Sequence, residues 1–283
     1  MDAKKLYQRL EGDFIKPGLS DDWTQYMEEV KDFLSENFKK QSMGLVCDNS
    51  DKITKVYTAV FPTDEVMQKI LDSGETDVLL FVHHPSIWDI TKAPKVFQQM
   101  NRDLLRQFKE RRISIYNLHV PLDNFGDYST SSTLARALGI EIDKPFAPYR
   151  GGLAGVTGRT KARTIDELAK NFEKAIKHKV GLYRYGTAEI KDGRVAVIAG
   201  GGNDMDVVPE IAKEGINTFV TGISSLNPHS KEAHDFLEKN KINLLGGTHY
   251  STEAFACQAI CSYFRKLGLN CEFIEGIPGL ADL

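Results

Sequence analysis

The chain has 283 residues, enough for two domains of ordinary size or one large one. Its 41% hydrophobic and 27% charged content is typical of a soluble globular protein, and a net charge of -3 gives no electrostatic reason to expect nucleic acid or an anionic membrane as the main partner. No apolar run approaches the ~20 residues of a membrane-spanning helix, and residues 1–14 lack the apolar core of a signal peptide. We therefore expect a cytoplasmic protein.

The four cysteines, Cys47, Cys257, Cys261 and Cys271, suit a reducing compartment. Cys257 and Cys261 are four residues apart on a predicted helix, a wider spacing than the CxxC of a zinc knuckle or redox motif. We expect both to be small core residues, because free cysteine is among the most buried residue types.

The first half of the chain has the element order of an α/β domain. Helices are predicted over residues 2–14 and 21–39, the second with its N-cap within Ser20-Asp21-Asp22, and β-rich segments follow at 43–48 and 53–60. A helix over 63–72 leads into an apolar run at 78–82, another helix covers about 94–111, and the next strand begins near residue 112. The order β, α, β favours a parallel sheet.

The first candidate site motif follows the apolar run 78–82, where the chain reads His83-His84-Pro85. Proline cannot continue a central strand, so the two imidazoles are predicted at a strand's C-terminal end, where open α/β sheets carry their ligand sites. Neighbours on an extended backbone point to opposite sides, so two metal ions or a bend at the strand end would be needed for both to ligate. Capping or hydrogen-bonding histidines are the alternative interpretation of the pair.

The second motif ends the next strand, at RISIYNLHVPLDN. His119 follows the apolar residues Ile113, Ile115 and Leu118, and Asp123 comes four residues later across Pro121. We take the proline to exclude a continuous helix, so a strand end and a loop are predicted to present an imidazole and a carboxylate. Asp123 could instead belong to a turn or a helix cap.

The second half begins after a helix predicted over 129–138. Two prolines and two glycines in residues 143–152 indicate a linker or domain crossing. Strands and helices then alternate to residue 222, which predicts a second, smaller α/β unit. Gly200, Gly201 and Gly202 follow a strand within it and resemble a phosphate-cradling loop, although the pattern is neither GxGxxG nor GxxxxGK[ST], and a tight strand-to-helix turn is the alternative.

The third motif follows a strand predicted over 242–245. His249 and Glu253 stand four residues apart with no intervening proline, and Ser251 or Thr252 is a candidate cap for the helix that continues from there. At the start of a helix this spacing puts the imidazole and the carboxylate on one face.

An apolar strand thus ends in histidine three times in this chain. The four histidines and two carboxylates are enough for two metal ions that keep open positions for water or substrate. Imidazole with carboxylate suits Zn, Fe, Mn or Co, and no thiolate lies in these motifs. We therefore favour a metal site over purely structural histidines.

These motifs resemble one known family. The HHP after a strand, NLHVPLDN, VAVIAGGG and the late GTHYSTE are similar to the NIF-three-like dinuclear metal-centre family, whose members are often named GTP cyclohydrolase I type 2 homologues. The resemblance runs from about Gly44 to Glu253 with the motifs in the same order. Carried over by position, the implied metal ligands are His83, His84, His119, Asp123, His249 and Glu253, with Glu253 or Asp123 as the bridging carboxylate.

The resemblance also implies an architecture. It predicts two α/β domains, with residues 1–127 and 242–283 forming the first and residues 128–241 the second. The metal site is expected at the C-terminal ends of the strands, between the domains. The same resemblance implies a homohexameric ring with two divalent ions, Zn, Fe or Mn, in each subunit.

The chain departs from the family pattern in its second domain. Relatives often carry an acid directly after the strand and its Thr-Gly, where this chain has Ile223. They also tend to have a histidine pair shortly afterwards, of which His234 is a candidate remnant. These differences concern substrate handling by the second domain rather than the metal ligands.

The predicted function is that of a metal-dependent hydrolase that uses a metal-activated water. If the family name applies, the substrate is GTP; a phosphoester or another nucleotide fits the ligands equally well, and Gly200 to Gly202 are then candidate phosphate contacts. The alternative is a non-enzymatic metal-binding, storage or adaptor protein, which the same ligands would serve.

Overall fold

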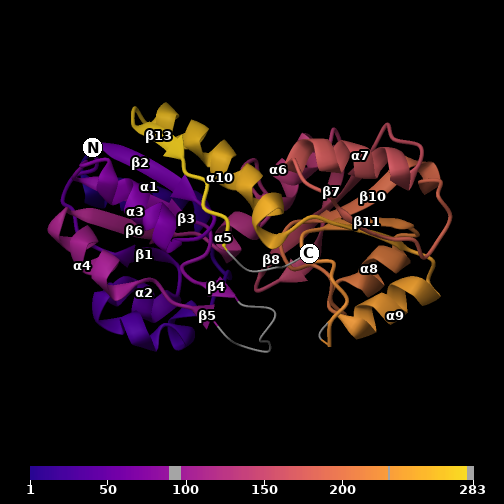
Figure 1. Ribbon diagram of the computed structural model, residues 1–283, viewed down its shortest axis with the longest axis horizontal. Coiled ribbons are helices and arrows are strands. Elements are labelled where there is room, and N and C mark those ends of the chain that lie inside the picture. Colours follow the sequence, from indigo (N-terminus) through magenta and orange to yellow (C-terminus); the bar gives the residue numbers. More distant parts are fainter. Residues whose placement is uncertain (89–96, 229, 279–283) are drawn as a thin grey trace. The chain divides into compact units, whose positions relative to one another are not determined.

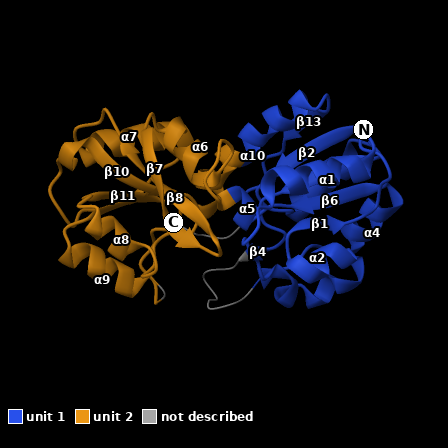
Figure 2. Cartoon of the chain, turned by 180° about the vertical axis from the view of Figure 1, so that it is seen from behind, with its two compact units in different colours: residues 1–122, 257–279 blue, residues 123–256, 280–283 orange. Residues whose placement is uncertain are grey.

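The computed structural model describes residues 1–88, 97–228 and 230–278, which form two α/β units (Figure 1). The first unit consists of residues 1–122 and a C-terminal segment that begins at residue 257, and the second of residues 123–256 (Figure 2). Among the described residues, no helix combines the length and the apolar character needed to cross a bilayer.

The first unit is built on a five-stranded sheet. Four strands run parallel, and the fifth, β1, pairs antiparallel with β6 at one edge. The order across the sheet is β1 (Gly44–Cys47), β6 (Ile113–Asn117), β3 (Val78–Val82), β2 (Lys55–Ala59) and β13 (Asn270–Phe273). The parallel β-α-β arrangement predicted from the element order is confirmed, and β3 is buried along its whole length.

Helices cover both faces of this sheet. On one face, the side chains of Leu80 and Ile115 join a core with the residues of α3 and α4. On the other, Phe81 packs edge-on against Phe264 of α10, with ring centroids 5.6 Å apart. The helices and helical turns are α1 (Ala3–Phe14), two 3₁₀ turns (Trp23–Tyr26 and Glu28–Phe33), α2 (Glu36–Gln41), α3 (Asp64–Asp72), α4 (Arg102–Glu110), α5 (Val120–Asp123) and α10 (His249–Lys266). The last residue of α5 and residues 249–256 of α10 belong to the second unit.

The continuous helix predicted over residues 21–39 is wrong. This stretch forms the two 3₁₀ turns and then α2, which is capped by Ser35 rather than by residues 20–22. The apolar side chains of Val30, Leu34 and Phe38 in this stretch are nevertheless buried. The break has a tertiary cause, because the N–H of Ser35 donates to Val46 in β1 and pulls the chain into an extended conformation at Leu34.

The helix predicted over residues 94–111 is shorter than expected. It begins at Arg102, where the Asn101 side chain caps it, and Phe97–Gln98 instead forms β5, paired with β4 (Ile87–Trp88). The part of this prediction that falls on residues 94–96 lies outside the described residues.

The second unit is built on a six-stranded sheet with a core on each face. Strands β10, β11 and β12 are parallel, and the other three pair antiparallel. Val195 and Val197 face helices α6 and α7, whereas Ala196 and Ile198 face α8 and α9. The sheet order is β7 (Glu141–Tyr149), β8 (Gly152–Arg159), β10 (Arg194–Ile198), β11 (Thr218–Thr221), β12 (Asn243–Gly246), β9 (Gly181–Tyr183); the helices are α6 (Thr130–Ala137), α7 (Ile165–Ile176), a 3₁₀ turn (Lys191–Gly193), α8 (Val208–Lys213) and α9 (Lys231–Lys239).

The linker predicted at residues 143–152 is wrong. These residues form most of strand β7 and the turn of the β7–β8 hairpin. Pro145 and Pro148 are compatible with a strand because β7 lies at the edge of its sheet, where the missing N–H need not pair. The hairpin turns at Arg150 and Gly151, both with positive φ.

The predicted domain boundary at residue 242 also needs correction. Strand β12 pairs in parallel with β11 from Thr218↔Asn243 to Thr221↔Gly246, so it belongs to the second sheet. His249 and Glu253 therefore lie in the second unit, and the chain returns to the first unit only after residue 256. The return itself occurs as predicted, since β13 adds to the first sheet beside β2.

Candidate metal centre

The His83-His84 pair lies directly after β3, at the carboxyl end of the first sheet. The N–H groups of His83 and His84 donate to the carbonyls of Ala59 and Val60, which extends the pairing with the neighbouring chain beyond β2. The backbone bends at His83, and the two imidazole centroids are only 4.3 Å apart. The sequence predicts that both histidines can ligate only with two metal ions or with a bend at the strand end. The structure has the bend.

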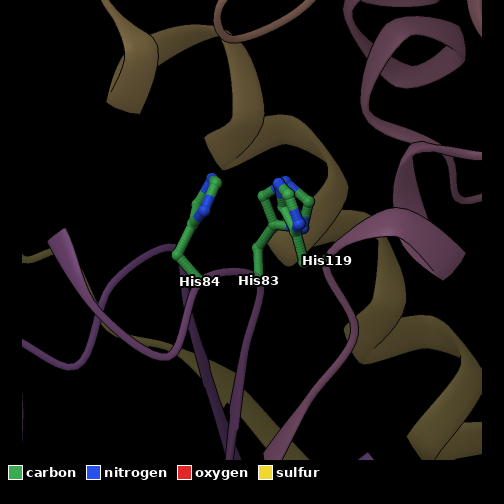
Figure 3. Close-up of side chains that lie close together, drawn as sticks. All are labelled: His83, His84 and His119. Carbon is green, nitrogen blue, oxygen red and sulfur yellow. The ribbon is translucent and has the colours of Figure 1, made fainter. Parts of the chain in front are cut away.

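His119 brings a third imidazole to the same place. Strands β3 and β6 are neighbours in register, with Val82 opposite Asn117, so the residues that follow them emerge side by side. The His119 centroid lies 5.3 Å from that of His83 and 4.8 Å from that of His84. The three rings project from the strand ends into one space (Figure 3), and one nitrogen of each lies within 4.8 Å of the others.

The orientation of His83 is set by the backbone of the neighbouring strand. Its Nδ1 lies 2.9 Å from the carbonyl oxygen of Leu118, an acceptor, so Nδ1 carries the proton. Nε2 is then the nitrogen that can coordinate a metal ion. The backbone carbonyl of His83 in turn accepts a hydrogen bond from the Asn117 side chain. Hydrogen bonds therefore hold both the imidazole ring and the backbone of His83.

His119 is oriented by a carboxylate. Its Nδ1 lies 2.9 Å from Oδ2 of Asp21, a residue 98 positions earlier in the chain. Burial raises the pKa of Asp21, but the interaction with His119 and the donated N–H groups of Asp22 and Val120 more than reverse this, so the pKa lies below its ordinary value. Asp21 is therefore an ionised acceptor for the imidazole rather than a helix cap.

Aromatic side chains enclose the histidine cluster within the first unit. The ring of Phe61 stacks on His84 with centroids 4.9 Å apart, and Trp23 packs edge-on against both His84 and His119. His83 and His84 are buried, and the His119 side chain is 13% exposed. An apolar wall of this kind lowers the local dielectric and strengthens the binding of a cation by its ligands.

Asp123 lies at the end of α5, which corrects one prediction. Residues Val120–Asp123 form a helical turn in spite of Pro121, because proline is tolerated in the first turn of a helix, where its missing N–H has no partner to lose. The carboxylate is buried, and its Oδ1 accepts a hydrogen bond of 2.8 Å from Thr130 at the start of α6. The spacing of His119 and Asp123 thus spans a helical turn rather than a loop.

His249 and Glu253 form the predicted pair on one helical face. Both lie in the first turns of α10, and His249 Nε2 is 3.1 Å from Glu253 Oε1. Their side chains are 10% and 4% exposed. The helix is capped by Thr248, whose Oγ1 accepts from the N–H of Ser251. Neither Ser251 nor Thr252 is the N-cap, but Ser251 takes part in the cap because its Oγ accepts from the N–H of Thr248.

The glycine loop after β10 packs against this pair. A Cβ atom at Gly200 would lie 2.2 Å from Glu253 Oε1, and Gly200 has a φ of +71°. The N–H of Gly200 donates to Thr252 Oγ1, and that of Gly202 donates to Thr221 Oγ1. The N–H groups of Gly200 and Gly202 already donate to side-chain hydroxyls of the same unit. The predicted backbone contact with a phosphate therefore stays a prediction for Gly201 alone.

The donor set fits divalent metal ions. Neutral imidazole and carboxylate are ligands of Zn, Fe and Mn, and a hydrogen bond at Nδ1, as in His83 and His119, is the usual way in which a metal-binding histidine is oriented. Each unit holds part of the predicted set: three imidazoles in the first, and Asp123, His249 and Glu253 in the second.

Comparison with known proteins identifies the family. The model of the Duf34/NIF3 (NGG1p interacting factor 3) family matches residues 20–278. The chain belongs to the DUF34/NIF3 family. A protein from Deinococcus radiodurans, named GTP cyclohydrolase 1 type 2 homolog, is 26% identical over 239 residues, which cover 84% of this chain and 86% of that protein. A protein of the same name from Pyrococcus abyssi is 26% identical over 264 residues, which cover 89% of this chain and 99% of that protein.

Solved structures show the same fold. The structure of protein ybgI, described as of unknown function, matches 99% of this chain and 100% of its own with a TM-score of 0.77 at 21% identity. Reduced HcgD from Methanocaldococcus jannaschii matches 98% of each chain with a TM-score of 0.67 at 25% identity. The NIF3-like fold expected from the motifs is therefore confirmed, as is the family.

Several residues of the site were not predicted from the sequence. Asp21 and Thr130 orient His119 and Asp123, but their hydrogen bonds depend on tertiary contacts that no local spacing indicates. The sequence predicts Thr252 as a candidate cap, whereas its hydroxyl accepts from the N–H of Gly200 and donates to the carbonyl of Thr248. The signal that could have pointed to Asp21 is weak, since an acid before an apolar stripe reads first as a helix cap.

His234, the predicted remnant of a histidine pair, is part of a buried polar network in the second unit. Its Nδ1 lies 2.7 Å from the Tyr185 hydroxyl, and its Nε2 lies 3.0 Å from the carbonyl oxygen of Ser224. Burial lowers the pKa of His234. Ile223, at the position where relatives often carry an acid, is buried beside the glycine loop, and its N–H donates to Gly200.

Replacing Gly200 with Ala should destabilise the second unit and displace Glu253. The left-handed backbone alone costs an L-residue about 1–2 kcal/mol, and the added methyl group would collide with the carboxylate. Denaturant unfolding measures the first effect. Gly201→Ala is the matched control, because a Cβ there would meet only Ile223 at 3.8 Å. Equal stability of the two variants would show that the Gly200 contact is unimportant.

The buried His234 should make stability fall in acid. Its folded pKa lies below the ordinary value of 6.5, so the unfolded chain binds a proton more readily, and the free energy of unfolding decreases as the pH drops through about 6.5. Urea unfolding of the wild type and of His234→Gln at a series of pH values measures this. The variant should lose less stability than the wild type between about pH 7.5 and about pH 5.5; an identical loss contradicts the assignment.

Proposed function

We propose that this DUF34/NIF3 protein is a metal-dependent hydrolase whose two divalent ions are held by His83, His84, His119, Asp123, His249 and Glu253. The observation that carries the proposal is the cluster of three imidazoles at the carboxyl ends of β3 and β6, of which His83 and His84 are buried and His119 is 13% exposed. Packing alone gives no reason to bring three polar rings together in an aromatic enclosure, whereas coordination of a cation does.

The second unit supports the proposal independently. His249 and Glu253 are buried next to each other at the start of α10, and the chain keeps a glycine at position 200 where any side chain would strike that carboxylate. Asp123 is buried and hydrogen-bonded to Thr130. Two carboxylates and four imidazoles give two divalent ions a ligand set with a charge of -2, which leaves the loaded centre cationic.

The chemistry follows from what such a centre supplies. When bound, a pair of divalent ions activates a water molecule near neutral pH and polarises the bond to be broken. The protein's own contribution is to hold the imidazoles in one tautomer, through Leu118 and Asp21, and to exclude bulk water with Trp23 and Phe61. A cationic centre favours an anionic substrate.

For the substrate we propose a nucleotide such as GTP or another phosphoester. The name of the relatives, GTP cyclohydrolase 1 type 2 homolog, supports GTP, and a two-metal centre also suits displacement at phosphorus. The ions proposed are Zn, Fe or Mn, in keeping with the imidazole and carboxylate ligands. A homohexamer in the cytoplasm remains part of the proposal, and light scattering of the purified protein tests the number of subunits.

The test is the metal content of protein purified without chelator, followed by assays with GTP and a panel of phosphoesters with and without added Mn or Zn. We expect about two ions per chain and hydrolysis of one substrate class that depends on the metal. His84→Ala and Glu253→Ala should each lower the metal content while circular dichroism shows an intact fold.

His178→Ala is the control, since this half-exposed histidine lies outside the cluster. Undiminished metal in both His84→Ala and Glu253→Ala would refute the ligand assignment. Two ions without turnover of any substrate would contradict the hydrolase and favour the non-enzymatic metal-binding or adaptor protein.

A further inference from the structure

Asp21 is one of the most buried carboxylates in the described part of the first unit, and it points at a candidate metal ligand. Its side chain is 1% exposed, and Oδ2 lies 2.9 Å from His119 Nδ1. Oδ2 also accepts from the N–H of Val120 at 3.4 Å, and Oδ1 accepts from the N–H of Asp22 at 2.9 Å. The carboxylate is thus held by N–H groups on both oxygens.

His83 and His119 differ in the charge of the acceptor behind them. Both rings have an acceptor 2.9 Å from Nδ1, so both direct Nε2 toward the cluster. Behind His83 the acceptor is the neutral carbonyl of Leu118, and behind His119 it is the anionic carboxylate of Asp21. Hydrogen bonds to a charged acceptor are roughly twice as strong as those between neutral groups.

This difference has a consequence for metal binding. A carboxylate at Nδ1 polarises the imidazole and makes Nε2 a stronger electron donor than a carbonyl does. Burying an anion is also costly unless a positive charge compensates it. A cation on His119 would supply that charge one imidazole away from Asp21, whereas a cation on His83 faces no such anion through its ring.

We propose that Asp21 is a positioning residue that makes the ion bound by His119 the more tightly held of the two. The inference rests on the proposed dinuclear centre and goes beyond it, because it makes the two metal positions unequal.

A purely structural role is the competing explanation. Asp21 could simply fasten the N-terminal segment to the end of β6 through His119 and Val120. Such a role would lower the stability of the fold without distinguishing one ion from the other. The affinities of the two ions, measured separately, therefore separate the explanations.

The experiment is a chelator competition with the full-length protein loaded with Zn²⁺, applied to the wild type, Asp21→Asn and Asp22→Asn. Asp21→Asn keeps the size and the acceptor oxygen but removes the charge. We expect it to weaken one of the two ions by about 10–100-fold and the other by less than about threefold. Asp22→Asn changes the neighbouring carboxylate in the same way and should leave both affinities as in the wild type.

A second measurement uses the wild type alone and so does not depend on how well a variant folds. The ¹⁵N shifts of the histidine rings are followed while Zn²⁺ is removed stepwise. His119 should keep its metal-bound Nε2 shift until the second ion leaves, with Nδ1 protonated throughout. Loss of the His119 signal with the first ion would overturn the inference.

The outcomes distinguish this inference from the proposed function. Two bound ions whose affinities are the same in Asp21→Asn and Asp22→Asn would overturn the role of Asp21 and leave the dinuclear centre standing. A wild-type protein that binds no metal would overturn the centre, and the role of Asp21 with it.

Discussion

The candidate site in the first unit depends on the parallel pairing of β3 with β6. Their register sets Val82 opposite Asn117, so that the first residues beyond each strand meet at the same edge of the sheet. That pairing places the carbonyl of Leu118 where it accepts from His83 and brings His119 beside the bend that holds His83 and His84. A shift of one residue would turn His119 to the other face and send its imidazole away from the cluster.

Neighbouring residues then fix the orientation of the histidine side chains. Leu118 and Asp21 hold Nδ1 of two rings, and Trp23 and Phe61 fill the space around them. The second unit uses the same principle with different parts, since Thr130 holds Asp123 and the absence of a side chain at Gly200 leaves room for Glu253. Most of these polar side chains are buried in both units, and the His119 side chain is only 13% exposed, which is the arrangement expected of a preorganised centre rather than of surface histidines.

Local patterns predicted most of the elements and the positions of the motifs. An apolar run that ends in His83-His84-Pro85 is a strand end whatever surrounds it, and the spacing of His249 and Glu253 requires only a helix. The predictions that failed were decided by distant contacts. The local sequence predicts Asp21 as a helix cap, but its carboxylate binds His119. It predicts a linker at residues 143–152, but most of these residues form a strand paired with β8. It places a domain boundary at residue 242, but β12 joins the sheet of the second unit. Spacing within a segment carries no information on such pairings, which join residues far apart in the chain.

The most direct test of the account is anomalous diffraction from crystals of the metal-loaded protein, recorded at the absorption edge of the bound metal. A dinuclear centre held by the proposed ligands predicts two peaks in each chain, coordinated by imidazole nitrogens of His83, His84, His119 and His249 and by the carboxylates of Asp123 and Glu253, with Asp21 hydrogen-bonded to Nδ1 of His119. Peaks that avoid the histidine cluster, or no peak in fully loaded crystals, would contradict it and return the three histidine motifs to a structural role.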